Sequence, residues 1–316
     1  MRVCVLTEET MDTFDPSQYL RDYEWGMATV QPPVLEFVRD ISRQKAYDVY
    51  LNLFEGFDDD ESSALGMVKA LESLNLPFTG AGSKFYNPTR EEMQGVAERN
   101  HIDFARGFRA VAVNDLSAAN SLHFPLIVKH PNSFASTGLT PDSRVDSFDE
   151  LILQFKRIVQ EFGAARVEEF IEGREVSCLI VDDPDDLLNP LAYPPAEVSF
   201  PPGETFLHEE VKWLNWDTYI VPLADPDLSH LVQELSKKMY CAMNGEGYSR
   251  MDIRVRPNGE LVILESNANC GILFEPDQRG HADLPITWEQ GGHSGFLDRI
   301  FRAAILRHKM RNIKSA

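Results

Sequence analysis

Hydrophobic positions in the first eighty residues switch between the period of a strand and the period of a helix. Residues 2–6 and 47–54 are short, nearly continuous apolar runs, which are typical of buried strands. Residues 33–44 and 60–74 instead repeat apolar side chains every three or four positions, the period of one buried helix face. The order strand, helix, strand, helix predicts parallel strands joined by right-handed crossovers. We therefore expect a small α/β domain that ends near residue 80.

Further along the chain, the same periods predict a strand that ends in lysine and three more helices. The strand covers residues 126–129, Leu-Ile-Val-Lys. A helix over residues 147–162 begins with the capping-box pattern Ser-x-x-Glu and is closed by Gly163. A second helix covers residues 227–244, and a third covers residues 296–309. The inward stripe of the second helix comprises Leu228, Leu231, Val232, Leu235 and Met239.

Two runs of alternating apolar and polar residues flank Asn258-Gly259, which is the strongest short-range signal for a two-residue hairpin turn. Counting back from that turn places Asp252 opposite Glu265. It also places Arg250 opposite Asn267. Since side chains repeat with period two along a strand, all four lie on one face of the hairpin. A three-residue loop with a bulge would shift this pairing by one position.

The expected hairpin face carries two carboxylates in direct opposition. Like charges on opposed positions, with Cβ atoms about 4.5–5.5 Å apart, destabilise a sheet unless a cation lies between them. Mg²⁺ and similar hard cations take oxygen ligands from carboxylates, amides, phosphates and water. Asp252, Glu265 and Asn267 therefore form a candidate metal site, beside the fixed positive charge of Arg250. The alternative is a solvated hairpin face whose charges point into water.

The composition is ordinary for a globular protein, whereas the net charge is strongly acidic. Of the 316 residues, 43% are hydrophobic and 25% are charged, and the formal net charge is -20. This length allows two or three packed lobes. The acidic balance argues against nucleic acid or an anionic membrane as a partner, because both bind basic surfaces. It leaves room for a nucleotide, which needs only a few local cations.

The apolar runs and the cysteines both favour a cytoplasmic protein. No apolar run approaches the roughly 18 residues that cross a bilayer, and the N-terminus turns acidic after one short strand. The four cysteines lie far apart and show no metal-type spacing. Reduced thiols in a cytoplasmic protein are therefore the expectation. These cysteines are Cys4, Cys178, Cys241 and Cys270.

The hairpin resembles the metal-binding strands of the ATP-grasp superfamily, in which an Asp on one strand and a Glu-x-Asn on the next hold Mg²⁺. Further motifs extend the resemblance to the D-alanine–D-alanine ligase family. It implies the α/β ATP-grasp fold, with a Rossmann-like N-terminal lobe and ATP held between two α+β subdomains. The lobes would cover residues 1–84, 85–165 and 166–316. The implied cofactors are ATP and Mg²⁺ or Mn²⁺, with the metal on Asp252, Glu265 and Asn267.

A lysine at the end of a strand, next to a loop of small residues, suits a polyphosphate. Lys129 supplies a point charge, and residues 132–139 supply backbone N–H groups. The pair resembles the family's phosphate-binding lysine and its serine/glycine lid loop, which implies a catalytic role for Ser136. Phe134 and Ala135 depart from this pattern, because the family usually has smaller or more polar residues there.

The stretch from residue 166 to residue 180 contains Glu-Glu-Phe-Ile and then Gly-Arg-Glu, and it resembles the family's adenine hinge. The resemblance implies that Glu168 accepts the adenine amino group through its carboxylate or its backbone. It also implies a backbone hinge contact at Ile171 and ribose binding by Glu175, since a carboxylate accepts two hydrogen bonds from a diol. The other residues assigned to the nucleotide are Glu169, Phe170, Phe206, Lys212 and Leu264. The alternative is a charged turn between strands.

Three further positions depart from the family pattern. Arg90 stands where a phosphate-binding lysine commonly follows the first lobe, and it is either a phosphate contact or an exposed helix-start residue. Trp213 replaces a tyrosine. Cys270 replaces a proline, and we expect a small filler there rather than a nucleophile. By the same resemblance, the N–H of Gly271 and the guanidinium of Arg250 stabilise the oxyanion of a tetrahedral intermediate.

These motifs imply an ATP-dependent carboxylate–amine ligase. ATP would phosphorylate a substrate carboxylate to an acyl phosphate, an amine would attack it, and ADP and phosphate would be released. The implied partners are small-molecule acids and amines, with neither nucleic acid nor membrane, and a homodimer is compatible because dimers are common in the family. An alternative is a nucleotide-binding regulatory protein that has lost ligase activity. The missing lysine, the altered lid loop and the lost proline favour that alternative.

The family's substrate-binding pattern is missing. The N-terminal His-Gly-Gly signature for the first ammonium is absent, and Glu8 or Glu9 occupies its region. The Ser-Leu pair that captures the second carboxylate is replaced by Leu-Phe-Glu-Pro, in which Glu275 should repel a carboxylate. We therefore predict that the chain does not make D-alanyl-D-alanine at a useful rate. Arg279 and His281 are candidates for recognising another amino acid or peptide-like precursor.

Overall fold

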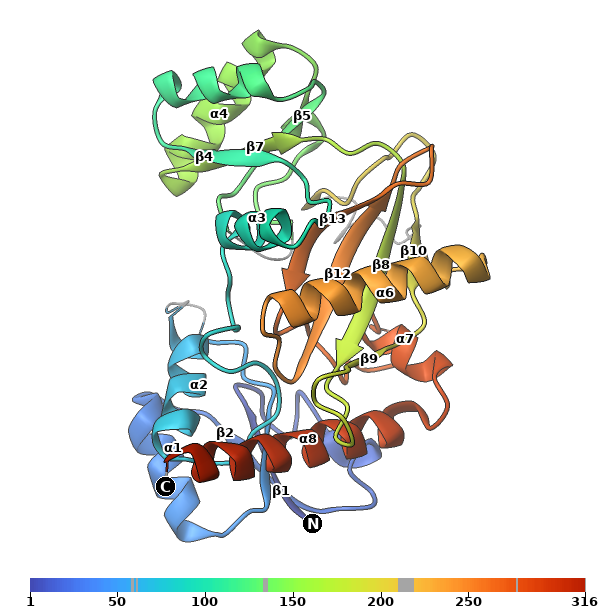
Figure 1. Cartoon of the computed structure of the whole chain (residues 1–316). Coiled ribbons are helices and arrows are strands. Elements are labelled where there is room, and N and C mark those ends of the chain that lie inside the picture. Colours follow the sequence, from blue (N-terminus) through green and yellow to red (C-terminus); the bar gives the residue numbers. More distant parts are fainter. Residues whose placement is uncertain (58–59, 61, 133–135, 210–218, 277, 316) are drawn as a thin grey trace.

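The computed structural model of the chain contains three β-sheets, each packed against its own helices (Figure 1). The structure describes residues 1–316 apart from 58–59, 61, 133–135, 210–218, 277 and 316. The first sheet is parallel and has the strand order β2-β1-β3, as the alternation of strands and helices predicts. Its strands are β1 (Arg2–Thr7), β2 (Glu24–Thr29) and β3 (Val49–Asn52).

Helices cover both faces of this parallel sheet. They are α1 (Val34–Gln44), α2 (Ser63–Ser73) and α8 (Gly292–Ser315). The strand residues Cys4 and Leu6 share one core with α1 and α2. Val3 and Val5, which point the other way, share a second core with α8. The last helix of the chain therefore packs on its first strand, and Figure 1 shows α8 crossing beside β1 and β2.

The second sheet is antiparallel and has the order β4-β7-β5-β6. Its strands are β4 (Gly107–Ala110), β5 (Leu126–Lys129), β6 (Arg144–Val145) and β7 (Ala165–Glu169). The helix α4 (Phe148–Phe162) and the 3-10 helix η2 (Val113–Ser121) complete its core. Because β7 belongs to this sheet, the sheet extends past residue 165, where the sequence predicted a boundary. The division into three lobes otherwise stays a prediction.

The third sheet follows the path β11-β10-β8-β12-β13, with β9 paired to β8. Its strands are β8 (Arg174–Val181), β9 (Leu191–Ala192), β10 (Ala196–Ser199), β11 (Tyr219–Pro222), β12 (Tyr248–Val255) and β13 (Leu261–Asn267). The long helix α6 (Pro226–Ala242) packs across one face (Figure 1). The other face is divided between α8, which packs with Leu179, Val181 and Tyr248, and the cavity described below. Shorter elements are η1 (Pro16–Gln18), η3 (Pro141–Ser143) and α7 (Asp283–Trp288).

Most elements that the hydrophobic pattern predicts are present, and their positions differ by a few residues. The strand β2 was missed, because its sequence, Glu-Trp-Gly-Met-Ala-Thr, neither alternates nor forms an apolar run. The stripe predicted for α6 is wrong at one position. Leu231 is 56% exposed, whereas Leu228, Val232 and Met239 are buried. Val232 lies four positions after Leu228, about one helical turn, and both are buried, whereas Leu231 lies at the edge of this face and meets solvent.

The hairpin of β12 and β13 has the predicted pairing but a different turn. Arg250 lies opposite Asn267, and Asp252 opposite Glu265, as predicted. Nearer the turn, however, the backbone N–H of Arg256 donates to the carbonyl of Glu260 at 2.8 Å, so the loop has three residues rather than two. A bulge between Asp252 and Ile253 then restores the predicted register. The extra residue of the bulge is on β13, directly before Glu265.

All four cysteines are free, and Cys4, Cys178 and Cys270 are buried. None of the helices in the described parts of the chain is both long and apolar enough to cross a bilayer.

The start of α4 provides a simple test of local stability. The backbone N–H of Glu150 donates to Oγ of Ser147 at 3.3 Å, which satisfies one of the free N–H groups of the first turn. Ser147→Ala should therefore lower the free energy of unfolding by about 1 kcal/mol. Ser62→Ala is the matched control, because Ser62 precedes α2 and its side chain caps no helix N–H. Equal losses for the two variants in calorimetry would show that the cap of α4 contributes nothing specific.

Candidate functional site

A cavity of about 920 Å³ lies between the second and third sheets, and it brings together nearly all the residues that the sequence singled out. Its walls come from β5, β7, β8, β12 and β13 and from the segments that follow β7 and β13. Lys212 lies outside the described residues. The predicted residues that line the cavity are Lys129, Ser136, Glu168, Glu169, Phe170, Ile171, Glu175, Phe206, Arg250, Asp252, Leu264, Glu265, Asn267 and Gly271.

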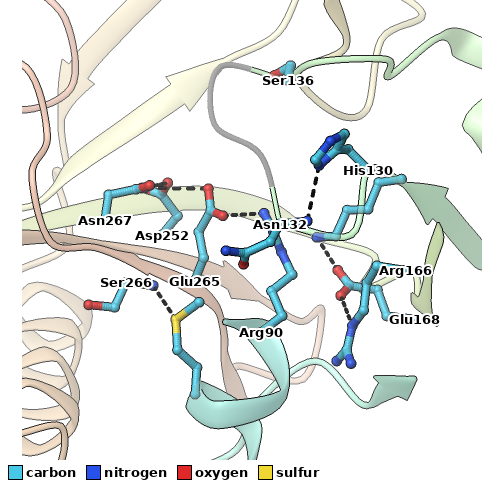
Figure 2. Close-up of polar contacts among 12 residues, drawn as sticks. Arg90, His130, Asn132, Ser136, Arg166, Glu168, Asp252, Glu265, Ser266 and Asn267 are labelled. Carbon is cyan, nitrogen blue, oxygen red and sulfur yellow. Dashed lines mark hydrogen bonds and ion pairs between the residues drawn. The ribbon is translucent and has the colours of Figure 1, made fainter. Parts of the chain in front are cut away.

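The candidate metal ligands lie side by side on the two strands of the hairpin (Figure 2). The Arg250 guanidinium donates to both carboxylate oxygens of Asp252, at 2.7 and 2.8 Å. Nδ2 of Asn267 donates to the same carboxylate at 2.8 Å. Arg90 forms an ion pair with Glu265. Each of the two opposed carboxylates is therefore neutralised by an arginine. Their opposition alone does not require a metal between them, although the sequence analysis assumed that it does.

The donor set nevertheless fits a hard cation. Asp252, Glu265 and Asn267 each carry a side-chain oxygen, the kind of ligand that Mg²⁺ and Mn²⁺ prefer, and a rotation of the Asn267 amide would exchange Nδ2, which faces Asp252 here, for its oxygen. Within the described residues, no group of three or more His, Cys, Asp or Glu is placed to hold a metal. Three protein oxygens leave the remaining positions to phosphate oxygens and water, which is how Mg²⁺ is commonly bound beside nucleotides.

A second charged cluster lies across the cavity, at the carboxyl end of β5. Lys129 pairs with Glu168, and Nε of Arg166 lies 3.2 Å from the same carboxylate. Burial alone would raise the pKa of Glu168, but Lys129 and Arg166 outweigh it, so the pKa is lowered and the group is a carboxylate. Burial lowers the pKa of Lys129, and the neighbouring carboxylate of Glu168 offsets part of this decrease. The carboxylate of Glu168 thus holds Lys129 in the cavity.

This arrangement narrows the role predicted for Glu168. The sequence allowed contact with adenine through either the carboxylate or the backbone, and the carboxylate is engaged by two cations. The hinge contact assigned to Ile171 stays a prediction. Among the described residues no hydrogen bond involves the backbone of Ile171, which follows the end of β7. Its N–H and carbonyl groups are therefore unpaired at the cavity wall.

Apolar side chains form the part of the cavity next to this hinge. Phe170 and Phe206 meet edge to face with ring centroids 5.7 Å apart, and Ile127 and Leu139 pack with them. Leu264, the extra residue of the hairpin bulge, faces the cavity directly before Glu265. Such a slot suits a planar aromatic base.

Glu175, the predicted ribose ligand, is paired with an arginine that the sequence analysis did not consider. Nη2 of Arg254 lies 2.7 Å from its carboxylate. Burial raises the pKa of Glu175 above its ordinary value, against the opposing effect of Arg254. Arg254 was detectable, since it follows Arg250 and Asp252 with period two on the same strand face. Arg166 was also detectable, because it precedes Glu168 by two on β7.

The far end of the cavity contains Gly271, and here one prediction is wrong. Gln18 donates to the carboxylate of Glu275 at 3.2 and 3.3 Å, and Glu275 is not part of the cavity wall. Arg279 and His281 line the cavity instead. The end that should have repelled a carboxylate therefore offers it a guanidinium. The sequence could not show this, because side-chain direction in an irregular loop follows no period.

Two further observations concern this end. A Cβ on Gly271 would lie 2.5 Å from the ring of Phe274, so a larger residue there would have to displace that ring. Burial raises the pKa of Cys270 to about 12, so the thiol is neutral near pH 7, as expected of a filler. On the side of the first sheet, the N–H of Glu55 donates to the carboxylate of Glu8 at 3.1 Å, and Glu55 lines the cavity.

Comparisons with known proteins agree with one another. Residues 95–274, more than half of the chain, match the family described as D-ala D-ala ligase C-terminus. The chain is 24% identical to the D-alanine–D-alanine ligase of Bacillus licheniformis, with 96% of this chain and 79% of that protein covered. It is 26% identical to the D-alanine–D-alanine ligase of Cupriavidus necator, with 87% and 80% covered.

Solved structures show the same fold. The D-alanine–D-alanine ligase of Bacillus anthracis complexed with ATP superposes with a TM-score of 0.72 at 19% identity, over 98% of this chain and 99% of that one. The ligase of Coxiella burnetii gives 0.70 at 15% identity, over 99% and 96%. The ATP-grasp architecture expected from the hairpin and hinge motifs is therefore confirmed.

Proposed function

We propose that this chain, which belongs to the D-alanine–D-alanine ligase family and is an ATP-dependent carboxylate–amine ligase, joins two molecules of D-alanine. The observation that carries the proposal is the single cavity that contains a metal-type donor set, buried cations and an apolar slot. The relatives named as D-alanine–D-alanine ligases support this substrate. They argue against the prediction that the chain does not make D-alanyl-D-alanine, and against the alternative of an inactive regulatory protein.

D-alanine was excluded because Glu275 was expected to repel its carboxylate. That argument no longer holds, because Glu275 accepts a hydrogen bond from Gln18 and does not line the cavity. A D-alanine acceptor carries a carboxylate, for which Arg279 is a suitable partner. A D-alanine donor carries an ammonium, for which the carboxylate of Glu55, close to Gly271 at the same end of the cavity, is a suitable partner together with its neighbour Glu8. The charges at this end of the cavity therefore fit an α-amino acid.

In this proposal, one set of cavity residues binds the nucleotide and another contacts the reacting groups. Phe170 and Phe206 enclose the adenine, and the backbone of Ile171 pairs with its edge. Glu175 accepts hydrogen bonds from the ribose. Lys129 lies at the end of β5, where its charge attracts the phosphates. A Mg²⁺ ion held by Asp252, Glu265 and Asn267 would supply charge that offsets the phosphate oxygens.

The reacting carboxylate lies at the other end of the cavity in this proposal. Burial alone would lower the pKa of Arg250, but contact with Asp252 raises it, so the guanidinium keeps its charge. Arg250 and the N–H of Gly271 stabilise the negative oxygen that develops when the amine attacks the acyl phosphate. Such preorganised donors typically contribute about 3–4 kcal/mol each to the transition state.

The test is phosphate release from Mg·ATP by the purified protein in the presence of D-alanine. We expect ADP and phosphate to form in equal amounts with a product that is lighter than two D-alanines by one water, as read by mass spectrometry. A panel of other D- and L-amino acids and dipeptides serves as the comparison. Turnover with a panel member but none with D-alanine would contradict the substrate. No turnover with any of them, despite ATP binding, would contradict the proposal as a whole.

A further inference from the structure

The first residue of α3 (Arg90–Arg99) occupies the candidate metal site. Arg90 is 6% exposed, lines the cavity and forms an ion pair with Glu265 (Figure 2). The helix start is fixed, because Thr89 and Glu92 form a complete capping box. The next residue, Glu91, bonds Arg166 at 2.9 Å. The first turn of α3 therefore contacts both charged clusters of the cavity, and its position is set by both.

The guanidinium of Arg90 is not fully satisfied by Glu265. Its Nε is buried and has no hydrogen-bond partner among the described residues. A buried N–H without a partner destabilises a protein, so a further acceptor at this point is favoured. Arg90 also lies close enough to Lys129 to lower its pKa. Two cations, Arg90 at the start of helix α3 and Lys129 at the end of strand β5, thus face the same part of the cavity, next to the unpaired Nε of Arg90.

The oxygens of the donor set are already in use in this arrangement. Oε2 of Glu265 contacts Arg90, and Oε1 lies 3.4 Å from Nδ2 of Asn267. Both oxygens of Asp252 accept from Arg250. A divalent cation on Glu265 and the guanidinium of Arg90 on the same carboxylate would repel each other, because like charges this close are costly inside a protein. Metal and Arg90 must therefore share or exchange this ligand.

We propose that Arg90 is a positioning residue that competes with the metal for Glu265. In the nucleotide-free enzyme Arg90 neutralises Glu265 and keeps the affinity for the metal low. When ATP enters, its phosphate oxygens supply the acceptors that the guanidinium lacks, and Glu265 becomes available to the metal. Metal and nucleotide then load together rather than the metal first. The inference rests on the proposed function, because ATP and the metal are its ligands.

The first test measures Mn²⁺ binding to the full chain without nucleotide, by the electron paramagnetic resonance signal of the free ion. Arg90→Met should bind Mn²⁺ about tenfold more tightly than the unaltered chain, within the range of typical coupling between two ligands. Arg90→Gln should also bind Mn²⁺ more tightly, which would show that the effect is not specific to the methionine side chain. The matched control is Arg99→Met, at the exposed end of the same helix, which should leave Mn²⁺ binding unchanged.

The second test measures binding of ATP with EDTA present, by calorimetry. Arg90→Met should lower the affinity for metal-free ATP severalfold, because the guanidinium is no longer available to the phosphates. Arg99→Met should leave that affinity unchanged. Unchanged or weaker Mn²⁺ binding in both Arg90 variants would overturn the inference. If D-alanine turnover were present in the unaltered chain, the proposed function would stand despite that result. Mn²⁺ binding that survives Glu265→Gln would instead contradict the metal site itself.

Discussion

The double variant Asp252→Asn, Glu265→Gln should lose Mg·ATP-dependent phosphate release by about a thousandfold or more, since removing even one group that stabilises transition-state charge costs about 10²–10³-fold. Both substitutions keep the size of the side chain and remove its charge. They take away two of the three oxygen donors on the hairpin face as anionic ligands. Steady-state phosphate release with D-alanine as substrate measures the effect.

The same variant separates loss of metal from loss of the nucleotide site. The apolar slot and Lys129 are untouched, and Arg90 and Arg250 lose their carboxylate partners. We therefore expect thermal stabilisation by Mg·ATP to fall to the level given by ATP with EDTA, which itself persists. Glu260→Gln, in the exposed turn of the same hairpin, should change neither quantity. Turnover within about threefold of the unaltered chain would show that the hairpin face is merely a solvated surface.

The hairpin shows how far sequence reasoning reached and why it stopped there. The pairing of Asp252 with Glu265 was predicted from a two-residue turn that does not exist. A three-residue loop shifts the register by one, and the bulge at Leu264 shifts it back. The two deviations cancel, so the period of two identified the correct face. Periodicity reports which side chains share a face, but it does not report turn type or bulges.

Contacts between distant segments were beyond the sequence. Arg90 and Glu265 are 175 residues apart, and no local pattern links the start of α3 to the end of β13. The same limit applies to Glu275, whose partner Gln18 is 257 residues away. Without that contact, the charge of Glu275 was assigned to the cavity and D-alanine was excluded. Residue types in the site were therefore predictable, whereas the ion pairs that set their roles were not.

The buried network around Glu168 leads to a large expected effect on stability. Arg166 is 0% exposed and bonds Glu168 at 3.2 Å, Glu91 at 2.9 Å and Gln94 at 2.7 Å. Arg166→Met fills a similar volume but leaves Glu168, within the described part of the chain, with Lys129 as its one direct ion-pair partner. Removing one partner of a buried ion pair typically destabilises a protein by about 3–5 kcal/mol, and we expect the lower end because Lys129 remains.

The pH dependence identifies the cause of that loss. The pKa of Glu168 is lowered in the fold, so its contribution to stability is present above the unfolded pKa, near 4.3, and is lost as pH falls through the folded value. The difference in the free energy of unfolding between Arg166→Met and the unaltered chain, measured in urea, should therefore keep its full size from pH 7 down to about pH 4.3 and shrink only below that pH.

Arg109→Met, at the exposed position paired with Arg166 on β4, is the matched control. Its loss should be small and should not vary with pH, because its charge is solvated. A loss for Arg166→Met that is equally independent of pH would mean that packing, and not the charge of Glu168, requires the arginine. In that case the position of Lys129 in the cavity would be set by strand β5 and not by its ion pair with Glu168.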